Sequence, residues 1–143
     1  MKHLWTVLCS RAVIDRDSNN VSLQNVIEQL TVHDEPSPEG FWPSRMDLLS
    51  LWMRNEVDEP ERGWGRLSLH APSGEVKGQW EFEIDLTDAL RTRSRLTFGG
   101  LPLSEPGIYM FNLEQRASKR HKWRLAAEVP LQVDFMPPID EEE

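Results

Sequence analysis

The sequence predicts an all-β protein, an antiparallel β-sandwich of two sheets with about eight strands and an immunoglobulin-like or C2-like appearance. Residues 123–135 alternate between apolar and mostly polar side chains, the period of a strand with one buried face. Residues 76–86 alternate in the same way, and a proline–glycine turn at 71–74 joins them to an apolar segment at 64–70. Turn-forming clusters recur at short spacing, as is typical of sandwiches.

The first predicted strand covers residues 2–14 and ends at a cluster of turn formers, 15–20, whose short side chains bond to their own backbone. The next apolar segment, 21–32, mixes strand and helix periods. We interpret it as one strand that is interrupted by a bulge near Asn25. Residues 44–54 are apolar on both alternating sets, which suits a central strand buried on both faces or a strand at an oligomer contact.

The second half of the chain continues the pattern of short strands. Residues 87–90 have the composition of one helical turn capped by a threonine. Further strands are expected at 93–101 and 108–116. The final strand, 123–135, contains Pro130, which cannot donate a ladder hydrogen bond and therefore marks an edge or a bulge.

We assign residues 1–136 to a single β-sandwich domain and residues 137–143 to an acidic, disordered tail. The single cysteine, Cys9, excludes an internal disulfide and makes a reducing compartment the simplest interpretation. No segment has the composition of a secretion signal or of a membrane span. We therefore expect a cytoplasmic protein without a membrane partner.

The charge of the chain is unevenly distributed. The net charge of −8 disfavours nucleic acid as a partner, yet residues 91–124 hold eight of the sixteen basic residues and only two of the twenty-four acidic ones. That segment therefore carries +6 and the remainder −14. Its cations are expected to form one basic patch, with a solvated surface as the plain alternative: Arg91, Arg93, Arg95, Arg116, Lys119, Arg120, Lys122 and Arg124.

This basic patch predicts a non-catalytic interaction or accessory module that docks an acidic protein partner. The first three arginines alternate and therefore share one strand face. A homo-oligomer is a second expectation, formed through an exposed strand edge or by contact between the basic patch and the acidic loop at 56–61. A ligand-binding module for an anionic molecule or a glycan stays open as an alternative.

Motifs for catalysis, cofactors and metals are missing from the sequence. Asp15, Asp17 and Asn19 imitate the start of a calcium loop, but Asn20 and Val26 stand where an EF-hand needs glycine and glutamate. The four histidines never fall at metal-ligand spacing, and Cys9 has no partner nearby in the sequence. We expect no cofactor, no metal site and no enzymatic activity. An enzyme whose site is assembled from dispersed loops remains the alternative.

Six tryptophans raise the possibility of a stacking platform for a sugar ring. Trp42 and Trp64 lie beside loops and are the candidate exposed platforms. The other four fall on apolar faces and are expected in the core: Trp5, Trp52, Trp80 and Trp123.

Three segments carry a resemblance to a known family: VLCSRAVID at 7–15, NNVSLQNVIE at 19–28 and GIYMF at 107–111. With the final strand, they resemble a family of small uncharacterised bacterial proteins that carries a domain-of-unknown-function label. The resemblance covers most of the chain and implies a bacterial source and a β-sandwich. It supplies no activity, cofactor or catalytic residue.

Overall fold

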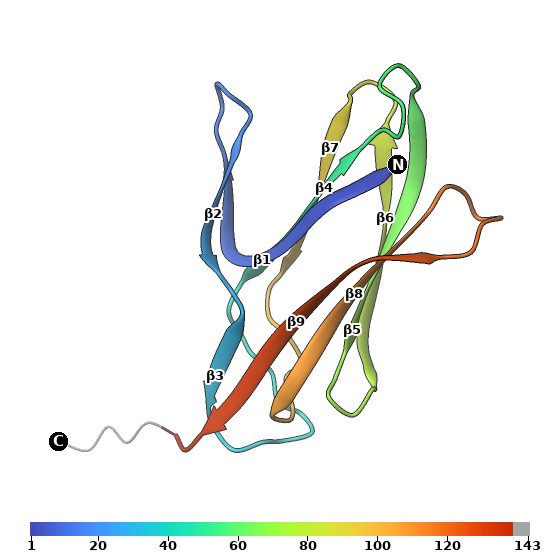
Figure 1. Cartoon of the computed structure of the whole chain (residues 1–143). Helices are drawn as coiled ribbons and strands as arrows, with labels where there is room; N and C mark the ends of the chain where they lie inside the picture. The colour runs from blue at the N-terminus through green and yellow to red at the C-terminus, as the bar shows by residue number, and fades with distance from the viewer. Residues whose placement is uncertain (139–143) are drawn as a thin grey trace.

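The computed structural model describes residues 1–138 and confirms the β-sandwich, with no helix in that part of the chain (Figure 1). One sheet has the strand order β2-β1-β4-β7 and the other β3-β9-β8-β5-β6. Most of the predicted acidic tail, residues 139–143, lies outside the described residues. The strands are β1 (Lys2–Ile14), β2 (Val21–Val26), β3 (Gln29–His33), β4 (Met46–Met53), β5 (Glu61–His70), β6 (Val76–Leu86), β7 (Arg91–Phe98), β8 (Gly107–Arg116) and β9 (Arg124–Met136).

The segment 21–32 is not one bulged strand, as the sequence suggested, but two strands in opposite sheets. The backbone turns at Asn25, whose φ is +53°, and Ile27 N–H then donates to the carbonyl of Leu8 at 2.8 Å. After this crossing β3 pairs with β9 in parallel, whereas the other strand pairs run antiparallel. The mixed period of this segment therefore reflects a change of sheet.

The main core lies between the two sheets. Trp52, Tyr109 and Phe111 are its largest fully buried side chains. The indole Nε1 of Trp52 donates to Ser94 Oγ at 3.0 Å, so its polar atom is satisfied inside the core. Trp80 is half-buried against the same core, and the core predictions for Trp52 and Trp80 are confirmed.

The phenol of Tyr109 fastens the connection before β8 to that strand. Its oxygen accepts from Ser104 N–H and Glu105 N–H, both at 3.1 Å, and its hydroxyl donates to the carbonyl of Glu105 at 2.9 Å. We expect Tyr109→Phe to lower the free energy of unfolding by about 1–3 kcal/mol, because it removes the partner of two part-buried amides. Urea denaturation measures this loss. An unchanged midpoint would show that the hydroxyl is dispensable.

The alternation at the start of the final strand gave a wrong prediction for Trp123. Leu113 pairs with Ala127 but Glu114 pairs with Leu125, so a bulge shifts the register and reverses which side chains face inward. Leu125 is 55% exposed as a result. Trp123 packs outside the core under two guanidinium groups, those of Arg66 and Arg116, at 4.7 and 4.1 Å.

The predicted helical turn at residues 87–90 does not form. The carboxylate of Asp85 accepts both the N–H and the hydroxyl of Thr87, a local turn that competes with helix initiation. This loop instead leads directly into β7.

Candidate binding cleft

The first sheet is apolar on its outer face as well as on the face toward the core. Cys9 and Ala12 of β1 and Leu49 of β4 form a second buried cluster there. The β1–β2 hairpin folds over this face, because β1 bends sharply along its length (Figure 1). At the centre of β4, Leu48 and Leu49 point to opposite faces and are both buried. The prediction of a strand buried on both faces is therefore confirmed there.

A buried carboxylate anchors the hairpin to the sheet. Asp47 of β4 is fully buried on the outer face. Its oxygens accept from Ala12 N–H at 3.0 Å, Thr97 Oγ1 at 2.8 Å and Arg95 Nη2 at 3.1 Å. Arg95 also donates to the carbonyl of Ala12. The ion pair between Asp47 and Arg95 connects β4 to β7, and the bonds of both residues to the Ala12 backbone connect this pair to β1.

The protonation of this anchor follows from its contacts. Burial raises the pKa of the Asp47 carboxyl, but the hydrogen bonds from Ala12, Thr97 and Arg95 outweigh burial and hold it below its ordinary value. The opposite holds for Cys9, whose thiol pKa is raised by burial and by the nearby Asp47 carboxylate. Cys9 is therefore a buried apolar residue rather than an activated nucleophile.

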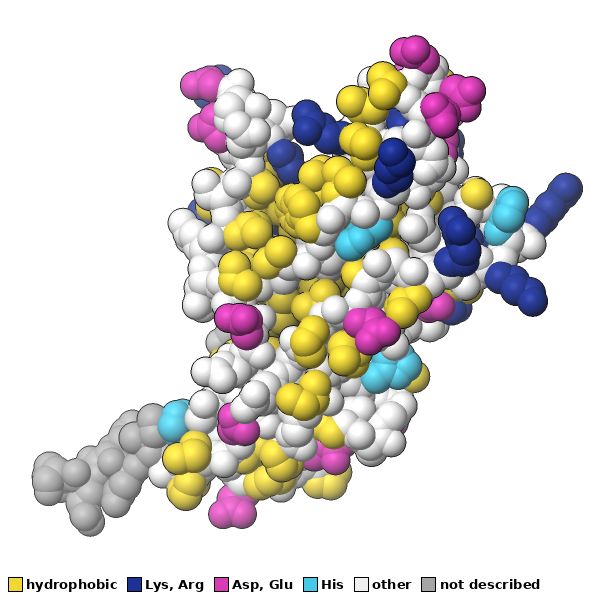
Figure 2. All heavy atoms as spheres, viewed as in Figure 1, with side chains coloured by type: hydrophobic (Ala, Val, Ile, Leu, Met, Phe, Trp, Pro, Cys, Tyr) yellow, Lys and Arg dark blue, Asp and Glu magenta, His cyan; other side chains and the backbone are white. Residues whose placement is uncertain are grey.

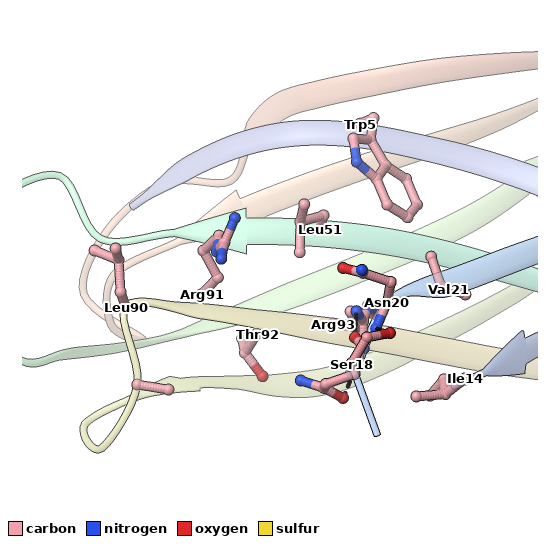
Figure 3. Close-up of a pocket in the computed structure, with 12 residues that line it drawn as sticks. Trp5, Ile14, Ser18, Asn20, Val21, Leu51, Leu90, Arg91, Thr92 and Arg93 are labelled. Carbon is pink, nitrogen blue, oxygen red and sulfur yellow. Dashed lines mark hydrogen bonds between the residues drawn. The ribbon is translucent and has the colours of Figure 1, made fainter. Parts of the chain in front are cut away.

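A cleft of about 860 Å³ remains between the tip of the hairpin and the outer face of the sheet. Trp5 of β1 and Leu51 of β4 supply apolar surface, Asn20 lies at the hairpin tip, and Arg91 and Arg93 come from β7 (Figure 3). Its volume lies within the range of sites that bind ligands, about 300–1,000 Å³. The edge of a sheet and a hairpin laid over it thus form a site with both apolar and polar walls.

The lining of the cleft holds positive but no negative side chains, although Asp17 and Asp88 directly precede the lining residues Ser18 and Ala89 in the sequence. Two of its twelve lining residues are arginines and none is acidic. The guanidinium of Arg93 donates to the side-chain oxygen of Asn19 at 3.4 Å and to the backbone carbonyl of Asn19. Within residues 1–138, the Nε of Arg93 has no hydrogen-bond partner, and Arg91 is exposed. An anionic group in the cleft would therefore meet two positive charges.

The predicted basic patch is divided between two sheets. Arg91, Arg93 and Arg95 lie on β7 of the first sheet, where Arg95 is committed to Asp47. The other five cations belong to the β8–β9 hairpin of the second sheet: Arg116, Lys119, Arg120, Lys122 and Arg124. In Figure 2, basic side chains appear near the hollow at the top and again at the right-hand end of the molecule. Of the five cations in the β8–β9 hairpin, Arg116 stacks on Trp123 and the other four are exposed.

The two predicted aromatic platforms lie on different elements. Trp42 makes an isolated bridge with Leu101 and packs against the core. Trp64 is half-buried on β5, opposite Arg116 of β8. The aromatic residue that does line the cleft is Trp5, which we expected in the core. The apolar character of both faces of 44–54 was the signal for it, because an apolar outer face needs a cover.

The candidate calcium loop forms a tight turn. Asp15 accepts from Ser18 N–H at 2.8 Å, and Asn19 N–H donates to the carbonyl of Asp15 at 2.8 Å. Hydrogen bonds from Ser18 lower the pKa of the Asp15 carboxyl. Across residues 1–138, no group of three or more histidine, cysteine, aspartate or glutamate side chains is placed to hold a metal ion.

No protein-family model and no curated protein matches the chain. The resemblance to the bacterial family therefore stays a prediction. Among the described residues, no helix has the length and apolar character needed to cross a membrane.

Proposed function

We propose that this protein is a non-catalytic interaction module whose cleft binds a protein segment with acidic and apolar side chains. The observation that carries the proposal is the composition of the cleft, where apolar surface lies beside two arginines and no acidic residue. Trp5 and Leu51 would cover apolar side chains of the segment. Arg91 and Arg93 would pair with its carboxylates through charge-assisted hydrogen bonds.

The lining of the cleft favours binding over catalysis. Its residues include no histidine, cysteine, lysine, aspartate or glutamate, so it offers no side chain suited to general acid–base chemistry near neutral pH. Ser18 lies at the hairpin tip without a base among the lining residues. The ring of Trp5 and the side-chain amides of Asn19 and Asn20 also suit an anionic glycan. Such a glycan is the second candidate occupant of the cleft.

We further propose that the sandwich is immunoglobulin-like and that the protein works in the reducing cytoplasm. Support for the fold comes from β3, which pairs in parallel with the last strand, and from Tyr109 near the start of β8. A tyrosine whose hydroxyl bonds to backbone just upstream is a feature of immunoglobulin domains. Support for the compartment comes from the single cysteine of the chain, which is fully buried.

The test is a titration with a fluorescein-labelled peptide of alternating glutamate and leucine residues, followed by fluorescence anisotropy. Arg91→Glu should weaken binding about tenfold or more, because it replaces an attraction with a repulsion. Arg91 is exposed, so the variant should fold normally. The matched control is Lys122→Glu, which makes the same charge change on the exposed β8–β9 hairpin and should bind like the wild type.

Added salt should weaken the wild-type complex, because the ionic contacts lie near solvent. Equal affinity of the wild type and Arg91→Glu would contradict the proposal. A response to polygalacturonate, with none to the peptide, would favour the glycan instead.

A further inference from the structure

We infer that the segment bound in the cleft belongs to a second copy of this chain. The loop between β4 and β5, residues 54–60, would enter the partner's cleft while the partner's loop enters this one. The inference rests on the proposed function, because it assumes that the cleft accepts acidic and apolar side chains. The sequence predicted a contact between the acidic loop and the basic patch. The inference places the acidic loop in the partner's cleft instead.

The loop has the chemistry that the cleft requires. Glu56, Asp58 and Glu59 surround Val57, whose side chain is 62% exposed. A hydrogen bond from Glu59 N–H to the carbonyl of Glu56 at 3.1 Å closes the turn. An apolar tip flanked by carboxylates complements an apolar surface flanked by arginines.

Arg54 holds this loop at the rim of its own cleft. Its guanidinium donates to the carbonyls of Leu86, Val57 and Thr87 at 2.8, 2.9 and 2.9 Å. Its backbone N–H donates to the carbonyl of Leu90, a lining residue, at 3.0 Å. The loop is therefore braced beside the cleft, which leaves the cleft open to another molecule.

This adjacency suits a symmetric dimer. A two-fold axis brings the same surface of both copies together, so a loop and a cleft that lie side by side can make both contacts at once. Figure 2 shows acidic side chains at the upper right, close to the hollow. Leu90 at the cleft wall is 37% exposed and would gain cover.

The β8–β9 hairpin is the competing receptor for the acidic loop. Its exposed cations could attract the same carboxylates, but Val57 needs an apolar surface. Near these cations, Leu125 is the exposed large apolar residue of the described hairpin and offers a single side chain instead of a cleft, since Ile108 and Met136 lie at the far ends of β8 and β9. The cleft therefore complements the whole loop, and the hairpin complements its charges alone.

Sedimentation equilibrium of the wild-type protein tests the inference, from about 1 µM to about 1 mM, the range of weak dimers. We expect a dimer that dissociates as salt is added. Arg91→Glu should be monomeric, and so should the loop variant Asp58→Arg/Glu59→Arg. Lys122→Glu should dimerise like the wild type.

Mixing the two monomeric variants gives the decisive result. In the mixed pair, one native loop meets one native cleft, and the arginines of the altered loop meet the introduced carboxylate of the altered cleft. Dimers should therefore return on mixing. A wild type that is monomeric throughout, a mixture that stays monomeric, or a dimer that is lost in Lys122→Glu but kept in Arg91→Glu would overturn the inference.

The peptide titration separates this inference from the proposed function. If the glutamate–leucine peptide binds through Arg91 while the wild type stays monomeric, the cleft binds acidic segments but not those of a second copy. If the peptide also fails to bind, the proposed function itself is wrong.

Discussion

Asp47→Ala should lower the free energy of unfolding by about 2–4 kcal/mol, because it removes a fully buried carboxylate that accepts three hydrogen bonds and leaves the buried Ala12 N–H without a partner. The substitution takes the acceptor from Ala12 N–H, which is buried, and from Thr97 and Arg95, whose side chains reach the surface. It should also free the β1–β2 hairpin and so open the cleft. Urea denaturation measures the loss of stability. Titration with the glutamate–leucine peptide measures the change in the affinity of the cleft.

Asp47→Asn is the matched control for this variant, because it keeps the shape and one acceptor oxygen while removing the charge. Its loss should be smaller than that of alanine. Loss of less than about 1 kcal/mol in Asp47→Ala would mean that the anchor contributes no more than an exposed ion pair.

The same residue predicts how stability depends on pH. The pKa of Asp47 is lower in the folded protein than in the unfolded chain, so the ionised form stabilises the fold above the unfolded value of about 3.9. This contribution is lost as the pH falls below about 4 and through the folded pKa. Asp47→Asn should therefore lose less stability on acidification than the wild type. Parallel pH profiles would contradict this prediction.

Leu49→Ala should lower the free energy of unfolding by about 2–5 kcal/mol, because its side chain fills the space between the sheet and the hairpin. Leu49 is fully buried against Cys9 and Ala12. Leu51→Ala is the matched comparison: the residue lies two positions along the same face of β4 but is half-buried in the open cleft. We expect it to cost less stability and to weaken peptide binding.

Chemical denaturation compares the loss of stability in Leu49→Ala, in the buried cluster, with the loss in Leu51→Ala, in the open cleft. Equal losses of stability would show that the hairpin does not close over Leu49. Unchanged peptide affinity in Leu51→Ala would remove this residue from the binding surface.

Local patterns predicted the strands well wherever one face is buried and a turn is marked by its residues. β1 begins and ends where the alternation and the turn formers at 15–20 placed it. The proline–glycine turn at 71–74 forms as expected, with Gly74 N–H donating to the carbonyl of Ala71 at 2.8 Å. The alternation in the sequence did not indicate the bulge in β9, because Ala126 and Ala127 are both small and apolar and either can face the core.

The candidate site was only partly predictable. Arginines at alternate positions of 91–95 correctly indicated one outward face. Which of them is free depends on Asp47, which lies 48 residues before Arg95 in the sequence and bonds to it only after β4 and β7 pair. Trp5 became a cleft residue because β1 bends and the hairpin covers the outer face. The pairing of Arg95 with Asp47 leaves no local signal, and the apolar outer face of 44–54 indicates that a segment covers it without indicating which one.

The most direct test of the binding cleft is a map of amide and indole NMR signals of the ¹⁵N-labelled protein during titration with the glutamate–leucine peptide. We predict that the Trp5 indole, the side-chain amides of Asn19 and Asn20 and the backbone of Arg91 and Arg93 shift together. The signals of residues 118–124 should stay in place. Shifts confined to 118–124, or to Trp42 and Trp64, would contradict the assignment of the cleft as the binding site.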